Sequence, residues 1–281
     1  MATYKDVLNE SINALKQAGV EDYEFDAQCL LEFCTGKSKT YLVLHSADIA
    51  EESTITQMRQ VCERRIKGEP LQYILGEWDF MSFSFYVGEG VLIPRPETEL
   101  LVETAVNNIK RFDNPVVFDL CAGTGCIGIS VAKICPNADV YLIEKSDKAY
   151  SFLLKNANKY QLKNITLVKA DITEGFSALD LPQPDIILSN PPYIEIDEIK
   201  NLSKEVQKEP VMALNGGVDG FDFYRCIIDL WLPHIKRNGF AALECGDTQA
   251  QIICKMAADI NNKASILKDY SKKDRIVCFD F

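Results

Sequence analysis

Apolar residues in the first part of the chain recur at steps of three and four, the spacing that places side chains on one face of a helix. Three such stripes are present: Val7, Leu8, Ile12, Leu15 and Ala18; Phe25, Cys29, Leu30 and Phe33; and Ile55, Met58, Cys62 and Ile66. Glycines at positions 19, 36 and 68 follow the stripes as stop signals. We therefore predict a small helical bundle over residues 1–76, with the stripes as its core faces.

Residues 77–90 change to an aromatic pattern of low helix propensity, with Trp78 followed by three phenylalanines. This pattern predicts a β-hairpin that links the helical domain to a second domain over residues 91–281. The second domain opens with IPRPETELLVETAVNNI, in which Pro96 suits the first turn of a helix.

Short apolar strands alternate with helical stretches from residue 115 onward. Strands are predicted at 116–120, 140–144, 165–169, 185–189, 240–245, 264–268 and 275–280. Continuous apolar strands separated by helices predict a parallel sheet covered on both faces. The last two strands are only about six residues apart, too close for a helical crossover, so they should form an antiparallel hairpin. Six parallel strands and one antiparallel strand give an α/β sheet that resembles the sheet of Rossmann-like methyltransferases.

Charge and cysteine content narrow the possible partners. The 281 residues carry a net charge of −11, which makes nucleic acid a poor default partner because phosphate binding needs a positive surface. Ten cysteines occur without a C-x-x-C pair and beside only two histidines, so we expect reduced core cysteines and no metal site. The N-terminal segment lacks an apolar signal core, and no run of about 18 apolar residues appears, so we expect a cytoplasmic protein with no membrane partner.

A glycine-rich turn follows the first strand of the second domain in the segment VVFDLCAGTGCIGISVA. Gly123, Gly125 and Gly128 fit the dinucleotide fingerprint of strand, glycine turn and helix. Glycines there let the backbone approach a ligand, and the free N–H groups of the following helix favour negative charge. Taken alone, the match also fits a tight turn that holds no ligand.

Acidic residues at the ends of strands distinguish the possible cofactors. Asp119 precedes the glycines, where a carboxylate suits the ammonium group of S-adenosyl-L-methionine but would repel a pyrophosphate. Glu144 ends the next strand, where either cofactor would offer it ribose hydroxyls. Asp171, after the third strand, is suited equally well to the adenine edge and to capping a helix.

The stretch SNPPYI ends the fourth strand with two prolines, through which no strand or helix continues. Ligands of open α/β sheets sit beyond the carboxyl ends of the strands, so this turn should lie beside the glycine loop. Asn190 and Pro191 each offer a carbonyl acceptor, and Tyr193 can pack against a planar group. Behind the glycine loop and Glu144, this set favours chemistry over a purely structural turn.

Two fixed acceptors suit the –NH2 group of an amide or aromatic amine, whose delocalised lone pair makes it a poor nucleophile. Binding both N–H groups orients the nitrogen and localises its lone pair toward an incoming methyl group. A strong base is unnecessary, because the nitrogen becomes very acidic once it is methylated. Catalysis is then mainly positioning and electrostatic stabilisation.

The ordered set of motifs resembles the HemK/PrmC family, which methylates the side-chain amide of a glutamine in peptide-chain release factors. The motifs are GEPLQYILGEWDF, LIPRPETELLVE, DLCAGTGCIGIS, SNPPYI, EPVMALNGGVDGFDFYR and LECGDTQ, and the resemblance covers the whole chain. It implies a helical domain over residues 1–76 that recognises the release factor, and a methyltransferase domain over residues 91–281.

The resemblance also implies roles for individual residues. Those implied for S-adenosyl-L-methionine are Cys121, Ala122, Gly123, Thr124, Gly125, Glu144, Asp171, Ile172 and Asn190; those implied for the substrate glutamine are Asn190, Pro191, Pro192 and Tyr193, with Arg95 in a turn lining the same pocket. Asn190, Pro191 and Tyr193 are the predicted catalytic set. One departure is Cys121, where family loops commonly have glycine, so its Cβ narrows the methionine end of the site.

Three other functions use parts of the same pattern. A methyltransferase for exocyclic amines of DNA or RNA would use the same turn and flip a base onto Tyr193, but the acidic charge opposes it. A binding module without activity would not need this complete set of residues. A nicotinamide dehydrogenase would leave the NPPY turn without a role.

Overall fold

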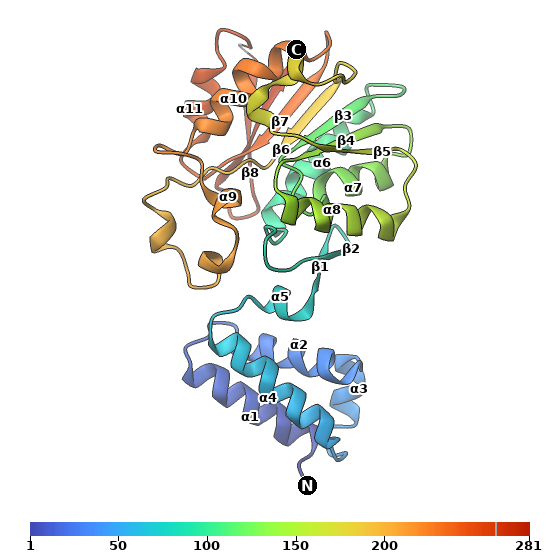
Figure 1. Ribbon diagram of the computed structural model, residues 1–281, viewed down its shortest axis with the longest axis vertical. Helices are drawn as coiled ribbons and strands as arrows, with labels where there is room; N and C mark the ends of the chain where they lie inside the picture. Colours follow the sequence, from blue (N-terminus) through green and yellow to red (C-terminus); the bar gives the residue numbers. More distant parts are fainter. Residues whose placement is uncertain (262) are drawn as a thin grey trace. The chain divides into compact units, whose positions relative to one another are not determined.

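The computed structural model describes residues 1–261 and 263–281, which divide into two compact units. Unit 1 comprises Met1–Glu77 with Ser203–Lys208, and unit 2 comprises Trp78–Leu202 with Glu209–Phe281. The elements of each unit are drawn in Figure 1.

Unit 1 is helical. Its helices are α1 (Tyr4–Gln17), α2 (Tyr23–Thr35), α3 (Lys39–Leu44), α4 (Glu52–Ile66) and α5 (Leu71–Leu75). A capping box begins α1, because the Thr3 hydroxyl accepts from the Asp6 N–H and the Asp6 carboxylate accepts from the Thr3 N–H. Helix α2 ends at Gly36, whose φ of 65° lies in the left-handed region that glycine adopts without strain.

The buried face of α2 differs from the predicted stripe. Leu30 is buried, but Phe25 is 56% exposed and Phe33 is 42% exposed. The helix instead turns Asp26 inward, where its carboxylate accepts from Arg65 Nε of α4 at 2.6 Å. A second Arg65 nitrogen donates to the Glu205 carboxylate at 2.5 Å. Unit 1 therefore contains a buried ion pair, between Asp26 and Arg65, that apolar periodicity could not reveal.

A seven-stranded sheet forms the centre of unit 2. Its strands are β3 (Val116–Leu120), β4 (Asp139–Glu144), β5 (Ile165–Lys169), β6 (Ile186–Ser189), β7 (Phe240–Glu244), β8 (Ala264–Lys268) and β9 (Asp274–Asp280). The strand order is β5-β4-β3-β6-β7-β9-β8, and among the described strands of this sheet β9 alone runs in the direction opposite to the other six. The predicted arrangement of six parallel strands and one antiparallel strand is confirmed.

Helices cover both faces of this sheet (Figure 1). One face packs against α6 (Glu99–Ile109), α7 (Cys126–Ile134) and α8 (Asp147–Tyr160), and the other against α10 (Asp222–Leu230) and α11 (Ala250–Met256). Successive residues of a strand alternate between these layers, so that Val117 joins the first core and Phe118 the second. The fold is therefore a three-layer α/β sandwich.

A separate two-stranded sheet, β1 (Glu77–Phe80) and β2 (Phe83–Tyr86), forms the predicted hairpin. Phe80 and Phe85 are buried in the first core of unit 2. The predicted helix at IPRPETELL begins as a 3-10 turn, Pro96–Thr98, and continues as α6. Short elements follow β5 and β6, including the 3-10 turn Ile172–Glu174 and α9 (Val211–Leu214).

Residues 1–261 and 263–281 also bear on membrane and metal partners. Within these described residues, no helix has both the length and the apolar character needed to cross a bilayer. The same part of the chain holds no group of three or more His, Cys, Asp or Glu side chains arranged to bind a metal ion.

Candidate active site

A pocket of about 920 Å³, including its solvent-open mouth, lies in unit 2 beyond the carboxyl ends of β3, β4 and β6. Its position matches the place where open α/β sheets bind ligands. The predicted site residues on its wall are Arg95, Cys121, Ala122, Gly123, Thr124, Glu144, Asp171, Ile172, Asn190 and Pro192. The predicted residues that do not line it are Asp119, Gly125, Pro191 and Tyr193.

The glycine loop is held close to the sheet by the two glycines that begin α7. Gly125 caps the helix with a φ of 80°. A Cβ at Gly128 would lie 2.7 Å from Leu142, so only glycine permits this approach of helix and strand. Asn156 of α8 donates to the Thr124 carbonyl at 2.9 Å and fixes the loop from its other side.

Cys121 begins this loop in a conformation that favours glycine. Its φ is 63°, in the left-handed region, and its side chain packs against the second core of unit 2. The left-handed region is costly for a residue with a Cβ, which gives a physical reason for glycine at this position in related loops.

Asp119 lies at the end of β3 and is fully buried. Its Oδ2 accepts from the Gly128 N–H at 2.8 Å, whereas Oδ1 has no hydrogen-bond partner among the described residues. Burial raises the pKa of this carboxyl to about 7, and the negative charge of Glu144 adds to the increase. An open acceptor behind the loop fits a ligand ammonium group, although Asp119 itself is not part of the pocket wall.

Glu144 joins the end of β4 to the glycine loop. Its Oε2 accepts from the Gly123 N–H at 2.8 Å and its Oε1 from the Ser146 N–H at 2.6 Å. Burial raises the pKa of Glu144, and these two N–H groups oppose the increase. The carboxylate is thus fixed on the pocket wall, and its remaining lone pairs suit a pair of hydroxyl groups.

Asp171 serves as a cap and also lines the pocket. Its carboxylate accepts from the Thr173 N–H at 3.0 Å, which caps the 3-10 turn, and pairs with Lys145 at 2.6 Å. Asp171, Ile172 and Lys145 all line the pocket. The capping interpretation is therefore correct, and it leaves the adenine role of Asp171 open as a prediction.

The NPPY turn presents Asn190 and Pro192 to the pocket. Asn190 Nδ2 donates to the Thr98 hydroxyl at 3.1 Å, which leaves Oδ1 as a free acceptor beside the glycine loop. Tyr193 is turned away from the pocket wall and packs against the second core of unit 2. Burial, together with the charge of Glu244, raises the pKa of the Tyr193 phenol to about 12.

The backbone beyond Tyr193 is enclosed by the segment NGGVDG. A Cβ at Gly216 would lie 2.7 Å from Tyr193 Cα, and one at Gly220 would lie 2.6 Å from the Tyr193 carbonyl oxygen. Gln249 Nε2 donates to the carbonyls of Tyr193 at 3.0 Å and Gly220 at 3.2 Å. One side chain therefore ties the NPPY turn to NGGVDG.

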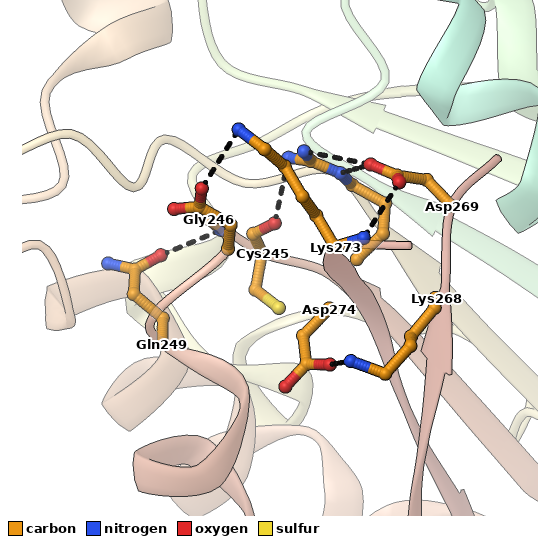
Figure 2. Close-up of polar contacts among 9 residues, drawn as sticks. Cys245, Gly246, Gln249, Lys268, Asp269, Lys273 and Asp274 are labelled. Atoms are coloured by element: carbon orange, nitrogen blue, oxygen red, sulfur yellow. Dashed lines mark hydrogen bonds and ion pairs between the residues drawn. The ribbon is translucent and has the colours of Figure 1, made fainter. Parts of the chain in front are cut away.

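Figure 2 shows how Gln249 itself is held. Its Oε1 accepts from the Gly246 N–H at 3.0 Å. Arg275 of β9 donates to the Cys245 carbonyl at 3.1 Å and pairs with Asp269, which fixes the end of β7 just before Gly246. These hydrogen bonds and this ion pair hold the segment LECGDTQ in place.

Glu209 fixes the part of the pocket wall formed by Ile93 and Arg95, and the sequence did not predict this role. Its buried carboxylate accepts from the Ile93 N–H at 3.0 Å and pairs with Arg95. Thr98 and Glu244 were also not predicted. All three lie inside motifs quoted above, and Glu244 also ends a buried strand, the same signal that identified Asp119 and Glu144.

Comparison with known proteins identifies the family. A family model described as the PrmC N-terminal domain matches residues 6–76, and one described as the methyltransferase small domain matches residues 96–217. The release factor glutamine methyltransferase of Thermodesulfovibrio yellowstonii is 37% identical over 243 residues, covering 85% of this chain and 86% of that protein. The same enzyme of Clostridium acetobutylicum is 33% identical, covering 97% and 96%. The chain belongs to the release factor glutamine methyltransferase family.

Solved structures show the same fold at low identity. The 16S rRNA N2 G1207 methyltransferase of T. Thermophilus has a TM-score of 0.52 and is 16% identical, covering 73% of this chain and 49% of that chain. A methyltransferase from Pyrococcus furiosus has a TM-score of 0.51 and is 15% identical, covering 80% and 97%. The resemblance to the HemK/PrmC family and to the Rossmann-like methyltransferase sheet is thus confirmed for this member of the release factor glutamine methyltransferase family.

Proposed function

We propose that this protein transfers a methyl group from S-adenosyl-L-methionine to the side-chain amide nitrogen of the glutamine in the Gly-Gly-Gln motif of peptide-chain release factors. The observation that most directly supports it is the position of Asn190, which presents a fixed carbonyl oxygen to the pocket beside the glycine loop. Membership of the release factor glutamine methyltransferase family supports the same substrate.

The cofactor would be held along the carboxyl ends of β3 to β5. Residues 121–124 of the glycine loop line this end of the pocket, Glu144 would accept from the ribose hydroxyls, and Asp171 and Ile172 would contact the adenine. Asp119 would accept from the ammonium group through Oδ1. When bound, S-adenosyl-L-methionine supplies a methyl group on a positively charged sulfur, and the amide nitrogen gains that methyl while it loses a proton.

The substrate amide would be held by the NPPY turn. Asn190 Oδ1 and the carbonyl of Pro191 would each accept one of the amide N–H groups, so that the nitrogen lone pair faces the methyl donor. These two acceptors gain strength as positive charge develops on the nitrogen. Pro191 does not line the pocket in this structure, so its carbonyl has to be exposed when the amide docks. Tyr193 would support the turn from behind.

Unit 1 and the cellular location are further parts of the proposal. Residues 1–76 contain no set of polar groups comparable to that of the pocket, and we assign these residues to recognition of the release factor. Because the chain has a net charge of −11, we propose that it binds the release factor without contacting nucleic acid. Because release factors act on ribosomes, the proposal places the protein in the cytoplasm.

Methylation of a purified release factor tests the function directly. The factor would be incubated with the protein and S-adenosyl-L-methionine, digested, and analysed by mass spectrometry. A gain of one methyl group on the glutamine of the Gly-Gly-Gln tip is expected. Methylation of single-stranded or duplex DNA or RNA in the same assay, with none on the factor, would instead favour the exocyclic-amine alternative, for which the family membership provides no support.

A variant series then tests the turn. Asn190→Ala should lower kcat by about 10² to 10³, because it removes one preorganised acceptor. Asn190→Asp should fall between Asn190→Ala and the unmodified protein, since it keeps an acceptor but adds a carboxylate near Glu144. A normal single-turnover rate for Asn190→Ala at saturating cofactor would reduce the turn to a structural strand stop.

A further inference from the structure

One face of α8 holds the chain segment that leads into the pocket wall. Side chains at steps of four along the helix meet residues at steps of two along the segment, and the pairs are Asn156 with Tyr86, Phe152 with Gly88, and Lys148 with Gly90. The two steps match, because four residues of a helix rise about 6.0 Å and two residues of a strand about 6.6 Å. Gly90 lies on the pocket wall, so α8 determines where this wall begins.

Two glycines allow the segment to lie close to the helix. A Cβ at Gly88 would lie 2.7 Å from the Phe152 ring, and one at Gly90 would lie 2.6 Å from Lys148 Cδ. Gly90 also has a φ of 108°, in the region that favours glycine. The segment therefore has no side chain at these two positions to hold it away from α8, and Asn156 adds a buried polar tie.

Asn156 is 0% exposed and uses both ends of its carboxamide. Its Oδ1 accepts from the Tyr86 N–H at 2.7 Å, while its Nδ2 donates to the carbonyls of Tyr86 at 3.1 Å and Thr124 at 2.9 Å. These bonds permit one orientation only, since a reversed amide would place –NH2 against an N–H group and oxygen against two carbonyls. Asn156 thus pairs with Tyr86 as a neighbouring strand would, and it reaches the glycine loop at the same time.

The bond to Thr124 fixes the peptide group between Thr124 and Gly125. The carbonyl of this peptide accepts from Asn156, and its N–H, that of Gly125, donates to the Ala122 carbonyl at 2.7 Å. Both polar ends of the peptide therefore have partners inside the protein, and the loop is held in shape before a ligand binds. Preorganisation of this kind lowers the cost of binding.

We propose that Asn156 is a positioning residue for the cofactor, because it joins the glycine loop to residues 86–90 although it does not itself line the pocket. The proposal rests on the proposed placement of S-adenosyl-L-methionine along the glycine loop. Leu153 and Ala157, its neighbours on α8, belong to the first core of unit 2, where an apolar side chain would be less costly to bury. The carboxamide is explained by the two backbone segments that it joins.

Substitution of Asn156 should weaken cofactor binding without slowing the chemical step. Asn156→Leu keeps the volume and removes all three bonds, and calorimetric titration should give a Kd for S-adenosyl-L-methionine that is raised roughly tenfold or more. At saturating cofactor and release factor, kcat should stay within about threefold, because the NPPY turn keeps its bonds to Thr98 and Gln249. A merely structural defect would instead reduce the fraction of active protein, which lowers kcat and leaves Kd unchanged.

Asn164→Leu is the matched control. Asn164 Nδ2 also donates to two backbone carbonyls, those of Ala132 at 3.1 Å and Ala138 at 2.9 Å, and none of these three residues lines the pocket. Its loss should lower the thermal stability and leave the cofactor Kd unchanged. An unchanged Kd for Asn156→Leu, or an equal rise for Asn164→Leu, would overturn the proposal.

Hydrogen exchange in the unmodified protein tests the same link without a substitution. Because coupling is reciprocal, a cofactor that binds the loop should protect the Tyr86 N–H, although Tyr86 does not line the pocket. With free S-adenosyl-L-methionine at about ten times its Kd, exchange of this amide should slow by about fivefold to tenfold. The Lys273 N–H, which also donates to a side-chain oxygen, that of Asp269 at 3.0 Å, should not slow.

Absent slowing at Tyr86, or equal slowing at Tyr86 and Lys273, would overturn the proposal even if Asn156→Leu failed to fold. Failure of the unmodified protein to bind S-adenosyl-L-methionine at all would instead count against the proposed function.

Discussion

The side-chain amide of Gln249 donates to the backbone carbonyl of Tyr193 at 3.0 Å, while its oxygen accepts from the Gly246 N–H at 3.0 Å. Gln249→Leu keeps the volume and removes both bonds, together with the bond to the Gly220 carbonyl, so the NPPY turn loses its tie to the end of β7. We expect kcat to fall about tenfold, whereas cofactor affinity stays within twofold, because Gln249 is not on the pocket wall.

Gln249→Glu distinguishes the hydrogen bond that Gln249 donates from the one that it accepts. A carboxylate still accepts from Gly246, but it cannot donate to the Tyr193 carbonyl. If donation to Tyr193 is what matters, Gln249→Glu should be at least as slow as Gln249→Leu. A Gln249→Glu rate equal to that of the unmodified protein would assign the role to the Gly246 bond instead.

Glu144→Ala should weaken S-adenosyl-L-methionine binding. A charge-assisted hydrogen bond contributes about 1.5–3 kcal/mol, and each 1.4 kcal/mol is about a factor of ten, so the expected loss is roughly tenfold to a hundredfold. Calorimetric titration measures it. Asp147→Ala is the control, because Asp147 is a nearby acid whose side chain is 97% exposed. An unchanged affinity for Glu144→Ala would remove the ribose assignment.

Cofactor affinity should depend on pH through Asp119. Its pKa of about 7 is raised above the usual value, so the carboxyl is mostly protonated below that pH. A ligand ammonium group prefers the ionised form, and affinity should therefore increase as pH rises through about 7. Titrations between roughly pH 6 and pH 8 would measure this trend. Asp119→Asn should bind more weakly and lose the dependence; a flat profile in the unmodified protein would limit Asp119 to anchoring Gly128.

Removal of the N-terminal helices should separate cofactor binding from substrate recognition. A chain that begins at Gly76 keeps every residue that lines the pocket. We expect it to bind S-adenosyl-L-methionine normally and to methylate a full-length release factor at least about tenfold more slowly. A short Gly-Gly-Gln peptide, which cannot use a remote recognition surface, should be methylated at a similar rate by both chains. Equal rates on the whole factor would give the helical region another role.

Arg65 should be important for the stability of unit 1. Arg65→Leu leaves Asp26, which is 3% exposed, as a buried acid without its cation. Such a loss typically costs about 3–5 kcal/mol, and urea unfolding monitored by helix content would measure it. Arg59→Leu is the control: its ion pair with Glu10 is exposed and should contribute less than about 1 kcal/mol. Replacing Asp26 and Arg65 together by leucine should recover much of the lost stability.

The sheet was predictable because buried parallel strands leave a clear local pattern. Each predicted strand lies within about two residues of an observed one, since five-residue apolar runs have few alternatives. The prediction that Phe25 and Phe33 lie on the buried face of α2 was wrong for the opposite reason. The inward face of α2 carries Asp26 together with Ala27, Leu30 and Leu31. Asp26 pairs with Arg65, 39 positions away in the chain, and apolar periodicity carries no information about such a partner.

The residues of the candidate site also divide into those that the sequence predicted and those that it could not predict. The sequence predicted the strand-end acids Asp119 and Glu144 and the NPPY turn. Each of them interrupts an apolar strand pattern with a residue type that is unusual at that place. Thr98 could not be found, because a threonine in the first turn of a helix is ordinary. Its hydrogen bond is to Asn190, in the turn that follows β6, and the two residues become neighbours only in the folded domain.

The position of β9 between β7 and β8 has a consequence for local unfolding. Because β9 is the only partner of β8 among the described strands, β8 cannot keep its inter-strand bonds once β9 separates from β7. The two strands should therefore open as one cooperative unit, and native-state hydrogen exchange should give their backbone amides a common free energy of opening. Arg275 belongs to that unit, so each opening also releases the Cys245 carbonyl and transiently loosens the support of the NPPY turn.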